Sequence, residues 1–509
     1  MNRPTGRRLL VSLAAGAGVL AGTFLVAGFT PRWVVLALAR TAFFLAPDAF
    51  VTFGIQRLGD LARPLLVVGT ALASLLLFGG LALAATLVAG ALGRERAEVV
   101  FAVGVVETLA AFALTVAPVP ALVGGAVGAA VVGLGGPGSG GDVDVARRDL
   151  LRSVATAAAA VGLAGALGAR RAMGSGTDGA DGRTISEVED PLVRELLSTA
   201  AERSLPLDGV DPLVSERFYE VDVNSADPDV DPESWTLSVG GELGESREYD
   251  LADLRNRPAR HRFVSLRCVG DSLNGSKLDT ALWTGVPVMD LLEELGVSDE
   301  EPCCVYVRAD DDYYQEFPLD ALESAFLAYG TNGRPLPTGH GFPVRLLVPG
   351  HWGEINLKWI TDIELGREER TGYWEKRGWH GTGPVNTVAK LHGVDVDGGT
   401  VTVGGHAHAG TRGISAVEVS TDGGDTWTEA VLSDPLPAAV AADAEPSDPS
   451  VGDGEAADAW RMWRHEYEAS EPHEVIARAT DGDGDLQERE ESEAFPSGAS
   501  GWVSRRVSP

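Results

Sequence analysis

The chain has few cysteines, few lysines and no histidine before residue 261. Its three cysteines, Cys268, Cys303 and Cys304, are too few for a disulfide framework, and none has the CxxC or CxxCH spacing of zinc, iron–sulfur or covalent haem sites. Cys303 and Cys304 begin a strand-like CCVYV run, in which neighbouring side chains point to opposite faces. We therefore expect both to be small packing residues and not a redox pair.

The scarcity of histidine and lysine limits the function further. Because all nine histidines follow residue 260, the apolar N-terminal region has no axial ligands for haem b, and the sequence predicts neither haem nor an iron–sulfur cluster. Only four of the 41 basic residues are lysine, and 73 acidic residues give a net charge of −32. This balance excludes a nucleic-acid partner, because phosphates require the opposite sign. It resembles haloarchaeal proteins, in which high salt screens self-repulsion.

Long apolar runs fill the first part of the chain, and the first 140 residues hold only five acidic residues. Runs of 17 to 25 apolar residues can span a bilayer. Four runs are at least 17 residues long, and a weaker Ala/Gly-rich run follows: Leu9–Phe29, Leu65–Leu92, Ala97–Ala117, Val119–Gly135 and Ser153–Ala169. The interrupted segment Pro31–Arg63 is expected to be an amphipathic loop on the membrane surface. Glu107 is expected as a packing residue more than as a proton or quinone contact.

Arginines beside these runs predict their orientation. If the N-terminus with Arg3, Arg7 and Arg8 is cytoplasmic, five spans place everything after residue 171 outside the cell. Residues 146–152, reading ARRDLLR, are similar to a twin-arginine export signal, which serves proteins folded before export. The alternative is an ordinary positively charged flank. Both interpretations predict a multi-pass protein of the cell membrane whose soluble part is extracytoplasmic.

Two motifs in the soluble part carry chemistry. The first, FVSLRCVGDSLNGSKLDTALWTGVPV at 263–288, places Cys268 on a tight loop after a strand-like run, and a thiolate is a soft ligand suited to a high-valent metal. The second, HGFPVRLLVPGHWGEINLKWITDIEL at 340–365, combines cations with glycines. Arg345 and Lys358 can bind a phosphate, and the glycines allow close approach.

Together the motifs are similar to the molybdopterin domain of the sulfite oxidase family, in a membrane-anchored haloarchaeal form. The resemblance covers about residues 212–490 and implies a molybdenum–molybdopterin cofactor, an oxygen atom transferred to or from a small substrate, and electrons exchanged with an external carrier. It implies a metal ligand and five cofactor-binding residues, which are Cys268, His340, Arg345, Gly350, Gly353 and Lys358.

Two further catalytic candidates come from the same resemblance. The run YYQEFPL ends at Leu319, and counting back makes Tyr313 the tyrosine that faces the metal, with Tyr314 as the alternative on the opposite strand face. Arg267 could supply charge for an oxyanion or support the ligand loop. Sulfite oxidases have arginines after the metal cysteine, whereas this chain has Val269 to Asp271. Sulfite oxidation, reduction of a sulfoxide or another oxyanion, and a non-catalytic sensor or assembly role therefore all stay open.

The sequence beyond residue 383 is β-rich. Alternating valines, a DGG turn and a WxxW pair resemble the immunoglobulin-like dimerisation domain of the same family, which implies a homodimer. The acidic segment Ser433–Ala457 is expected to be disordered. The expected architecture is a transmembrane α-helical region (1–171), a linker (172–205), an α+β molybdopterin domain (206–383) and a β-sandwich of the immunoglobulin type (384–495).

Overall fold

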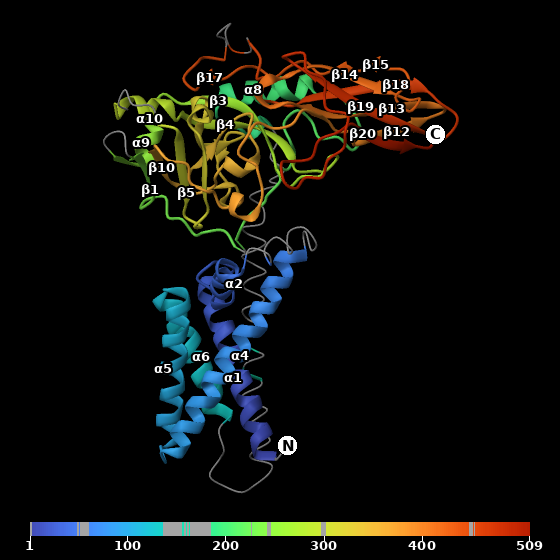
Figure 1. Ribbon diagram of the computed structural model, residues 1–509. Coiled ribbons are helices and arrows are strands. Elements are labelled where there is room, and N and C mark those ends of the chain that lie inside the picture. Colours follow the sequence, from blue (N-terminus) through green and yellow to red (C-terminus); the bar gives the residue numbers. More distant parts are fainter. Residues whose placement is uncertain are drawn as a thin grey trace. The chain divides into compact units, whose positions relative to one another are not determined.

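The computed structural model describes residues 3–47, 50, 61–135, 155, 156, 159, 162, 185–224, 226–241, 246–296, 302–446, 451 and 454–509 (Figure 1). The chain divides into two compact units. Unit 1 comprises Met1–Asp178 and Asp222–Asp229, and unit 2 comprises Gly179–Val221 and Val230–Pro509. The twin-arginine-like segment and most of the weak fifth apolar run lie outside the described residues.

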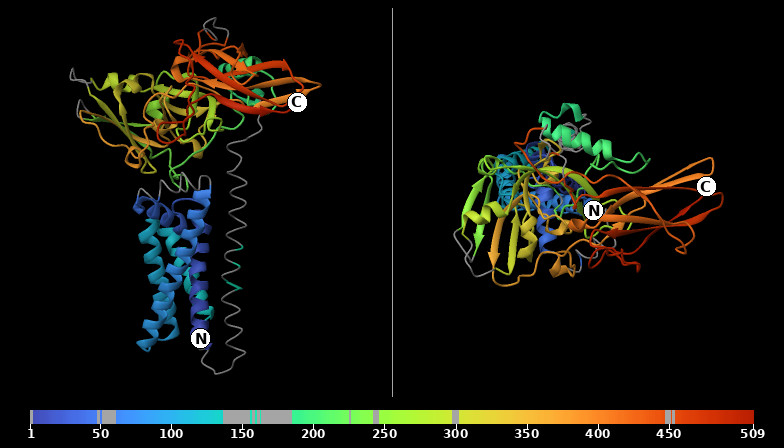
Figure 2. Two further views of the ribbon diagram at one scale, coloured as in Figure 1. Left: turned by 45° about the vertical axis from the view of Figure 1, so that its right-hand side comes forward. Right: turned by 90° about the horizontal axis from the view of Figure 1, so that it is seen from above.

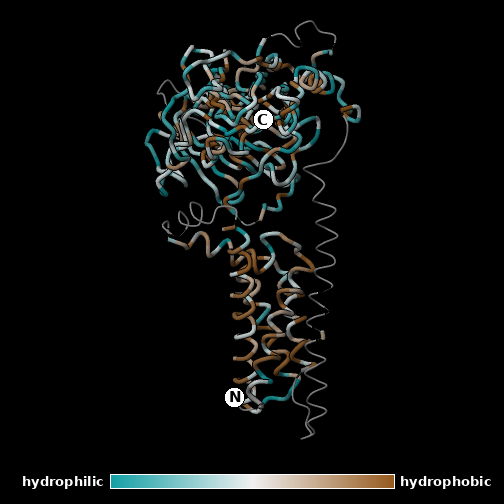
Figure 3. Tube along the Cα trace, turned by 90° about the vertical axis from the view of Figure 1, so that its right-hand side faces the viewer, coloured by the Kyte–Doolittle hydropathy of each residue, from teal (hydrophilic) through white to brown (hydrophobic). Residues whose placement is uncertain are grey.

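Unit 1 consists of apolar helices, which stand out in brown in Figure 3. They are α1 (Arg3–Ala27), α2 (Val34–Leu45), α4 (Ala62–Ala91), α5 (Arg96–Thr115) and α6 (Pro118–Gly135). In the described part, three of them are long and apolar enough to cross a membrane, namely Gly6–Ala27, Ala62–Ala91 and Arg96–Thr115. The fourth expected run forms α6, but its apolar stretch Pro118–Leu134 falls short of that length.

The expected surface loop Pro31–Arg63 is wrong over its first half, because residues 34–45 form helix α2. Val34 and Val35 are fully buried and pack with Val19 of α1 and Phe78 of α4. The physical reason is the run VVLALA, which supplies enough apolar surface to be buried against the other helices. Glu107 of α5 is also buried. A Cβ at Gly128 of α6 would lie only 2.1 Å from its Oε2 atom.

The first described elements of unit 2 are a 3-10 turn and a helix in the segment ISEVEDPLVRELLSTAAE. Unit 2 contains three short α-helices and six 3-10 turns among its described residues: α8 (Pro191–Arg203), α9 (Leu251–Arg255), α10 (Met289–Glu294), η3 (Ile185–Glu187), η4 (Leu319–Ser324), η5 (Thr338–His340), η6 (Gly353–Ile355), η7 (Glu375–Arg377) and η8 (Gly410–Arg412). Helix α8 lies beside the C-terminal strands (Figure 2), and Arg203 at its end donates to the carbonyl of Pro435.

Helix α8 begins at an N-cap carboxylate, since Asp190 Oδ1 accepts hydrogen bonds from the backbone N–H groups of Leu192 (2.9 Å) and Val193 (3.3 Å). We expect Asp190→Ala to weaken the helix by about 1 kcal/mol, because two N-terminal donors lose their acceptor. Amide hydrogen exchange in α8 is the measurement. Asp190→Asn is the matched control, since asparagine caps as well as aspartate, and unchanged exchange in the alanine variant would contradict the capping role.

Two sheets follow in the expected α+β arrangement. The first has the order β2-β1-β10-β5-β6 and is mixed, because β1 and β10 run parallel while the other pairs are antiparallel. Its strands are β1 (Thr236–Gly241), β2 (Arg247–Asp250), β5 (Cys304–Ala309), β6 (Tyr314–Pro318) and β10 (Ile360–Gly366). The second has the order β17-β3-β4-β7-β8, and β9 pairs with β7. Its strands are β3 (Arg260–Arg267), β4 (Leu278–Pro287), β7 (Phe326–Thr331), β8 (Arg334–Pro335), β9 (Arg345–Leu347) and β17 (Val440–Ala441).

Strand β17 comes from the acidic segment that was expected to be disordered. Val440 pairs with His261 and Ala441 with Arg260, so this segment of the C-terminal region extends the second sheet at β3. The expectation of disorder is wrong for residues 433–446. Val440 and Leu436 are buried, and their apolar surface is removed from water in spite of the acidic residues around them.

The described residues of the C-terminal region form two antiparallel sheets. One joins β11 (Val388–Ala389), β12 (Gly393–Asp397), β13 (Thr400–His408), β16 (Val431–Leu432) and β18 (Arg461–Glu468), and the other joins β14 (Ile414–Ser420), β15 (Thr428–Glu429), β19 (His473–Asp481) and β20 (Val503–Val507). The DGG sequence connects β14 to β15, as predicted for a turn. Trp460 and Trp463 of the WxxW pair are both buried in the core that these strands share with α8.

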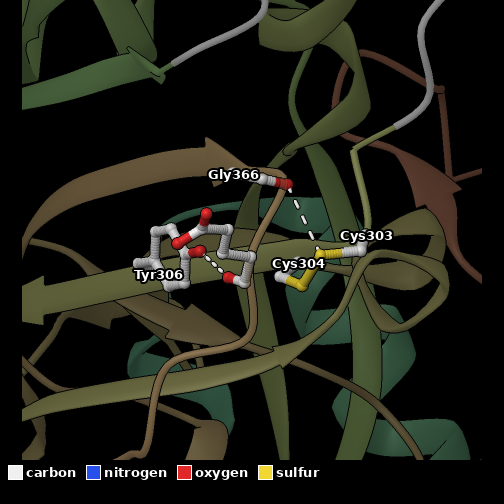
Figure 4. Close-up of a disulfide and its surroundings, with 5 residues drawn as sticks. Cys303, Cys304, Tyr306 and Gly366 are labelled. Atoms are coloured by element: carbon white, nitrogen blue, oxygen red, sulfur yellow. Dashed lines mark hydrogen bonds between the residues drawn. A yellow bond between two sulfur atoms is a disulfide. The ribbon is translucent and has the colours of Figure 1, made fainter.

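Cys303 and Cys304 are joined by a disulfide (Figure 4), so their assignment as separate packing residues is wrong. The alternation of side chains does not apply, because β5 begins only at Cys304 and Cys303 precedes it. Cys303 is exposed with its sulfur 3.7 Å from the carbonyl oxygen of Gly366, while Cys304 is buried. Cys268 is the free cysteine of the chain.

Candidate cofactor site

Cys268 is the first residue after β3, at the start of a loop of residues 268–277, named here the ligand loop. Its backbone N–H donates to the carbonyl of Lys277 (3.0 Å) and its own carbonyl accepts from Asp271 N–H (3.0 Å). Asp271 Oδ1 also accepts from Lys277 N–H (3.1 Å). These bonds close the loop on itself and fix the direction in which the half-buried thiol points.

Residues of the C-terminal region form hydrogen bonds with the ligand loop. The buried ammonium of Lys390 donates to the carboxylate of Asp271 and to the carbonyl of Gly275, at 2.6 Å for the latter. Asn274 exchanges two hydrogen bonds with the backbone of Leu391, at 2.9 and 2.8 Å. The position of Cys268 therefore depends on residues that follow it by more than 100 positions.

Arg267 is fully buried, and its guanidinium donates to the carbonyls of Asn386 (3.1 Å) and Ala499 (3.2 Å). It also lies 5.0 Å from the centre of the Trp352 ring, a cation–π contact. Burial lowers the pKa of Arg267 to about 10, and the charges of Asp271 and Cys268 oppose this shift. Of the two roles open to Arg267, this geometry favours support of the ligand loop.

The thiol of Cys268 lies in an environment that disfavours its charge when no cation is bound. Burial raises its pKa, while the backbone N–H of Gly270 and the charge of Lys277 lower it. A bound metal cation reverses this balance, since a coordinating thiol is deprotonated outright. The site thus suits a cysteine that becomes a thiolate when it holds a metal.

Tyr219 is a site residue that the sequence motifs did not identify. Gly353 lies between Tyr219 and Cys268, because a Cβ at Gly353 would lie 3.0 Å from the Tyr219 hydroxyl and 3.6 Å from the Cys268 Cα. Burial raises the pKa of Tyr219, the charge of Cys268 raises it further and that of Arg345 lowers it. The FY pair at residues 218 and 219, already visible in the sequence, was the available signal.

The second motif gathers the expected cofactor-binding side chains around η5. Arg345 is buried and donates to the carbonyls of His340 (3.3 Å) and Asn356 (3.1 Å), and Lys358 donates to that of Gly339 (2.7 Å). Gly341 makes this possible, because at its φ of +107° a Cβ would lie 2.9 Å from Arg345 Cβ and 3.1 Å from Lys358 Cα. The imidazole of His340 packs edge-on against Phe218, with ring centroids 5.7 Å apart.

The two motifs therefore fold onto each other. Gly353 of the second motif lies against Cys268, and Tyr219 lies near both Cys268 and Arg345. A thiol, two cations and a glycine without a side chain in one neighbourhood fit a metal held by a phosphate-bearing organic cofactor. Gly350 is placed differently. Its Cβ would lie 2.9 Å from Thr411, so the close approach of the C-terminal region already requires glycine there.

Tyr313 precedes β6 and Tyr314 is its first residue, and the two hydroxyls have different partners although both rings contact Tyr373. Tyr313 is the buried one, and its hydroxyl donates to the carbonyl of Glu354 (2.8 Å), the residue after Gly353. The Tyr314 hydroxyl accepts from Lys376 Nζ (2.7 Å) at the surface. His351 lies at the junction with Pro384, and His380 is exposed.

Fold and site together define a molybdopterin-binding oxidoreductase. Residues 224–374 match the oxidoreductase molybdopterin binding domain, and residues 384–495 match the Mo-co oxidoreductase dimerisation domain. The chain belongs to the sulfite oxidase family of molybdopterin oxidoreductases.

The relatives include vertebrate and bacterial proteins. Mitochondrial sulfite oxidase of Mus musculus is 32% identical over 253 residues, covering 40% of this chain and 46% of that protein. The Homo sapiens enzyme is 30% identical over 285 residues, covering 47% and 50%. An uncharacterized oxidoreductase of Bacillus subtilis, YuiH, is 32% identical over 152 residues, covering 30% and 74%. The chain thus spans about half the length of the sulfite oxidases it matches.

Proposed function

We propose that this protein is a membrane-anchored molybdenum oxidoreductase that transfers an oxygen atom between water and a small substrate, with oxidation of sulfite to sulfate as the first candidate reaction. The observation that carries the proposal is that Cys268 lies against Gly353 and that Tyr219 lies near both Cys268 and Arg345. It supports a catalytic protein over a sensor or assembly protein, because a site without a metal gains nothing from a half-buried thiol in a neighbourhood that contains cations.

In this proposal different residues bind the metal, bind the cofactor, orient the substrate and support the ligand loop. Cys268 would hold the molybdenum, and His340, Arg345 and Lys358 would hold the pterin cofactor. The bound cofactor supplies two-electron oxygen-atom chemistry and one-electron exchange with an external carrier. Tyr313, fixed by its bond to Glu354, would orient substrate or water, and Arg267 would keep the ligand loop in place.

A reductase acting on a sulfoxide or another oxyanion is the second candidate, and the ligand loop favours it. After Cys268 come Val269, Gly270 and Asp271, so no arginine follows the metal cysteine directly. Asp271 brings negative charge, and Lys390 is bonded to it. A neutral sulfoxide requires no cation, whereas sulfite binding has to rely on charges from elsewhere in the site.

We expect the full chain, purified in high salt and detergent, to contain about one molybdenum per chain and to reduce ferricyanide in the presence of sulfite. Metal analysis and a steady-state assay test this. Molybdenum-loaded protein that ignores sulfite but oxidises a reduced viologen with a sulfoxide would establish the reductase. Protein that never binds molybdenum would leave the sensor or assembly role.

The remaining assignments concern the location and the assembly of the protein. We propose that the apolar helices anchor the protein, that residues beyond 171 are extracytoplasmic, and that the C-terminal region is an immunoglobulin-like domain that forms a homodimer. The matched dimerisation domain and the three long apolar helices support this. A monomer mass by light scattering in detergent, or protection of unit 2 from protease in right-side-out vesicles, would contradict the respective assignment.

A further inference from the structure

Behind Tyr313 lies a group of buried oxygen atoms that the oxygen-transfer site does not use directly. Gln315 Nε2 donates to Glu354 Oε1 at 2.6 Å. The carboxyl of Glu375 lies next to that of Glu354 and to the amide of Gln315. The three side chains come from β6, η6 and η7, and we name them the acid cluster.

The space around the acid cluster is kept open by two glycines. A Cβ at Gly372 would lie 1.7 Å from Gln315 Oε1 and 2.3 Å from Glu375 Oε2. A Cβ at Gly381 would lie 1.8 Å from Glu354 Oε2. Any other residue at either position would collide with the cluster, so both glycines are explained by the cluster's presence.

The acid cluster has fewer hydrogen-bond donors than acceptors if both carboxyls are ionised. Among the described residues, no donor reaches four of its buried oxygens: Gln315 Oε1, Glu354 Oε2, Glu375 Oε1 and Glu375 Oε2. Adjacent buried acceptors repel one another and each lacks its solvation. One proton between the two carboxyls gives a donor to this group and removes one charge, as in carboxylate dyads that share a proton.

The electrostatic surroundings favour such a proton. Burial raises the pKa of Glu354, and the neighbouring carboxyl of Glu375 raises it further. The other titratable groups facing Glu354 are the hydroxyl of Tyr313 and the thiol of Cys268, and neither brings positive charge. On η7 itself, Lys376 donates to Tyr314 and Arg377 to the carbonyl of Tyr373 (2.6 Å).

The acid cluster has an outlet to solvent. A pocket of about 540 Å³ is lined by Tyr313, Gln315 and Gly372 on its inner side and by Arg308, Asp312, Glu316, Arg370 and Lys376 toward the surface. It adjoins the cluster through Gln315 and Gly372. On the opposite side, Glu354 follows Gly353, which lies against Cys268. The cluster therefore lies between the Cys268 side of the domain and this pocket.

We propose that Glu354 and Glu375 share one proton and pass protons between the Cys268 side of the domain and the pocket beside Gly372. The proposal rests on the proposed function and adds a proton route to it. Adding an oxygen atom from water to sulfite yields sulfate, two protons and two electrons. The electrons leave through the external carrier, and the protons require titratable groups that connect a buried site to solvent. In the reductase, the same groups deliver protons inward.

Infrared spectroscopy of the full chain tests the shared proton without any turnover. Because burial also raises the pKa of Asp458, to about 7, the readout at pH 7 is the spectrum of the wild type minus that of Glu354→Gln, in which we expect a protonated-carboxyl C=O band that shifts in D2O. Glu369→Gln is the matched control, because Glu369 is exposed and should leave the band intact. Absence of this band from the difference spectrum at pH 7 would overturn the proposal, since both carboxyls would then be ionised.

Stability against pH gives an independent check with a definite sign. Because folding raises the pKa of Glu354, the folded protein keeps a proton that the unfolded chain releases above its ordinary pKa of 4.5. The stability from this group is complete below that value and falls as pH rises. Glu354→Gln should therefore melt at a higher temperature than the wild type at pH 8, with a difference that shrinks toward pH 5. A difference that does not change with pH would contradict the proton.

Steady-state kinetics of Glu354 variants distinguish a proton route from a merely structural role of this carboxyl. We expect Glu354→Gln to lower kcat by on the order of 10², to leave the KM for sulfite unchanged and to enlarge the solvent deuterium isotope effect. Glu354→Asp should restore part of kcat. If the infrared band belongs to Glu354 but Glu354→Gln leaves kcat unchanged, the proton is structural and the proposed proton route is wrong. If no substrate is turned over while the band is present, the proposed function fails and the shared proton stands.

Discussion

Cys268→Ser is expected to lower the rate of molybdenum-dependent turnover by a factor on the order of 10³, equivalent to a loss of about 4 kcal/mol of transition-state stabilisation. The physical reason is the ligand: a serine hydroxyl is harder and far less acidic than a thiol, and the buried site already raises the pKa of the group at this position. Metal content and steady-state rate are the measurements. The pterin should still bind, because Arg345 and Lys358 are untouched.

The matched control uses the other two cysteines. Replacing both Cys303 and Cys304 by serine removes the disulfide at the start of β5 but leaves the ligand loop intact. We expect that variant to keep its molybdenum and most of its rate. Equal losses in the two variants would mean that the metal is not bound through Cys268, and the assignment of the site would have to be abandoned.

Lys390→Met is expected to destabilise unit 2 by roughly 3–5 kcal/mol, because it leaves the buried carboxylate of Asp271 without its ammonium partner. Since Asp271 closes the ligand loop, molybdenum occupancy should fall together with the melting temperature. Thermal unfolding followed by circular dichroism, with metal analysis of the same samples, measures both effects.

The double variant Lys390→Met/Asp271→Asn separates the charge from the packing. Asparagine can still accept from Lys277 N–H, and the buried charge is gone, so much of the lost stability should return. A double variant no more stable than Lys390→Met would show that the methylene packing of Lys390, and not the ion pair, holds the ligand loop.

Local patterns in the sequence were sufficient for much of the fold. Helices α1, α4, α5 and α6 lie at the four long apolar runs, and the turn between β14 and β15 followed from its DGG sequence. Strand β17 could not be predicted, because two residues in an acidic segment form a strand only through pairing with β3, about 180 positions earlier. Helix α2 was missed because Arg32 and Arg40 concealed an apolar face that is buried by other helices.

The same distinction between local patterns and long-range contacts separates the site residues that could be predicted from those that could not. Cys268, His340, Arg345 and Lys358 were visible because each lies in a contiguous motif that specifies its own local geometry. The FY pair marked Tyr219 without showing its role, and Glu354 carried no signal, since the importance of both comes from the approach of Gly353 to Cys268 and from burial, which no single segment encodes. The disulfide escaped prediction because the start of β5 at Cys304 decides whether the two side chains diverge.

The bond from Arg267 to the carbonyl of Ala499 joins residues 232 positions apart. A ribosome adding 5 to 20 residues per second needs roughly 10 to 50 s to cover that distance. During this interval the guanidinium of Arg267 lacks this carbonyl acceptor, although the carboxylate of Asp271 lies 3.9 Å away, so the ligand loop is without part of its final support. We therefore expect cofactor insertion, and any transport of this part of the protein in its loaded form, to follow completion of the C-terminal sheets.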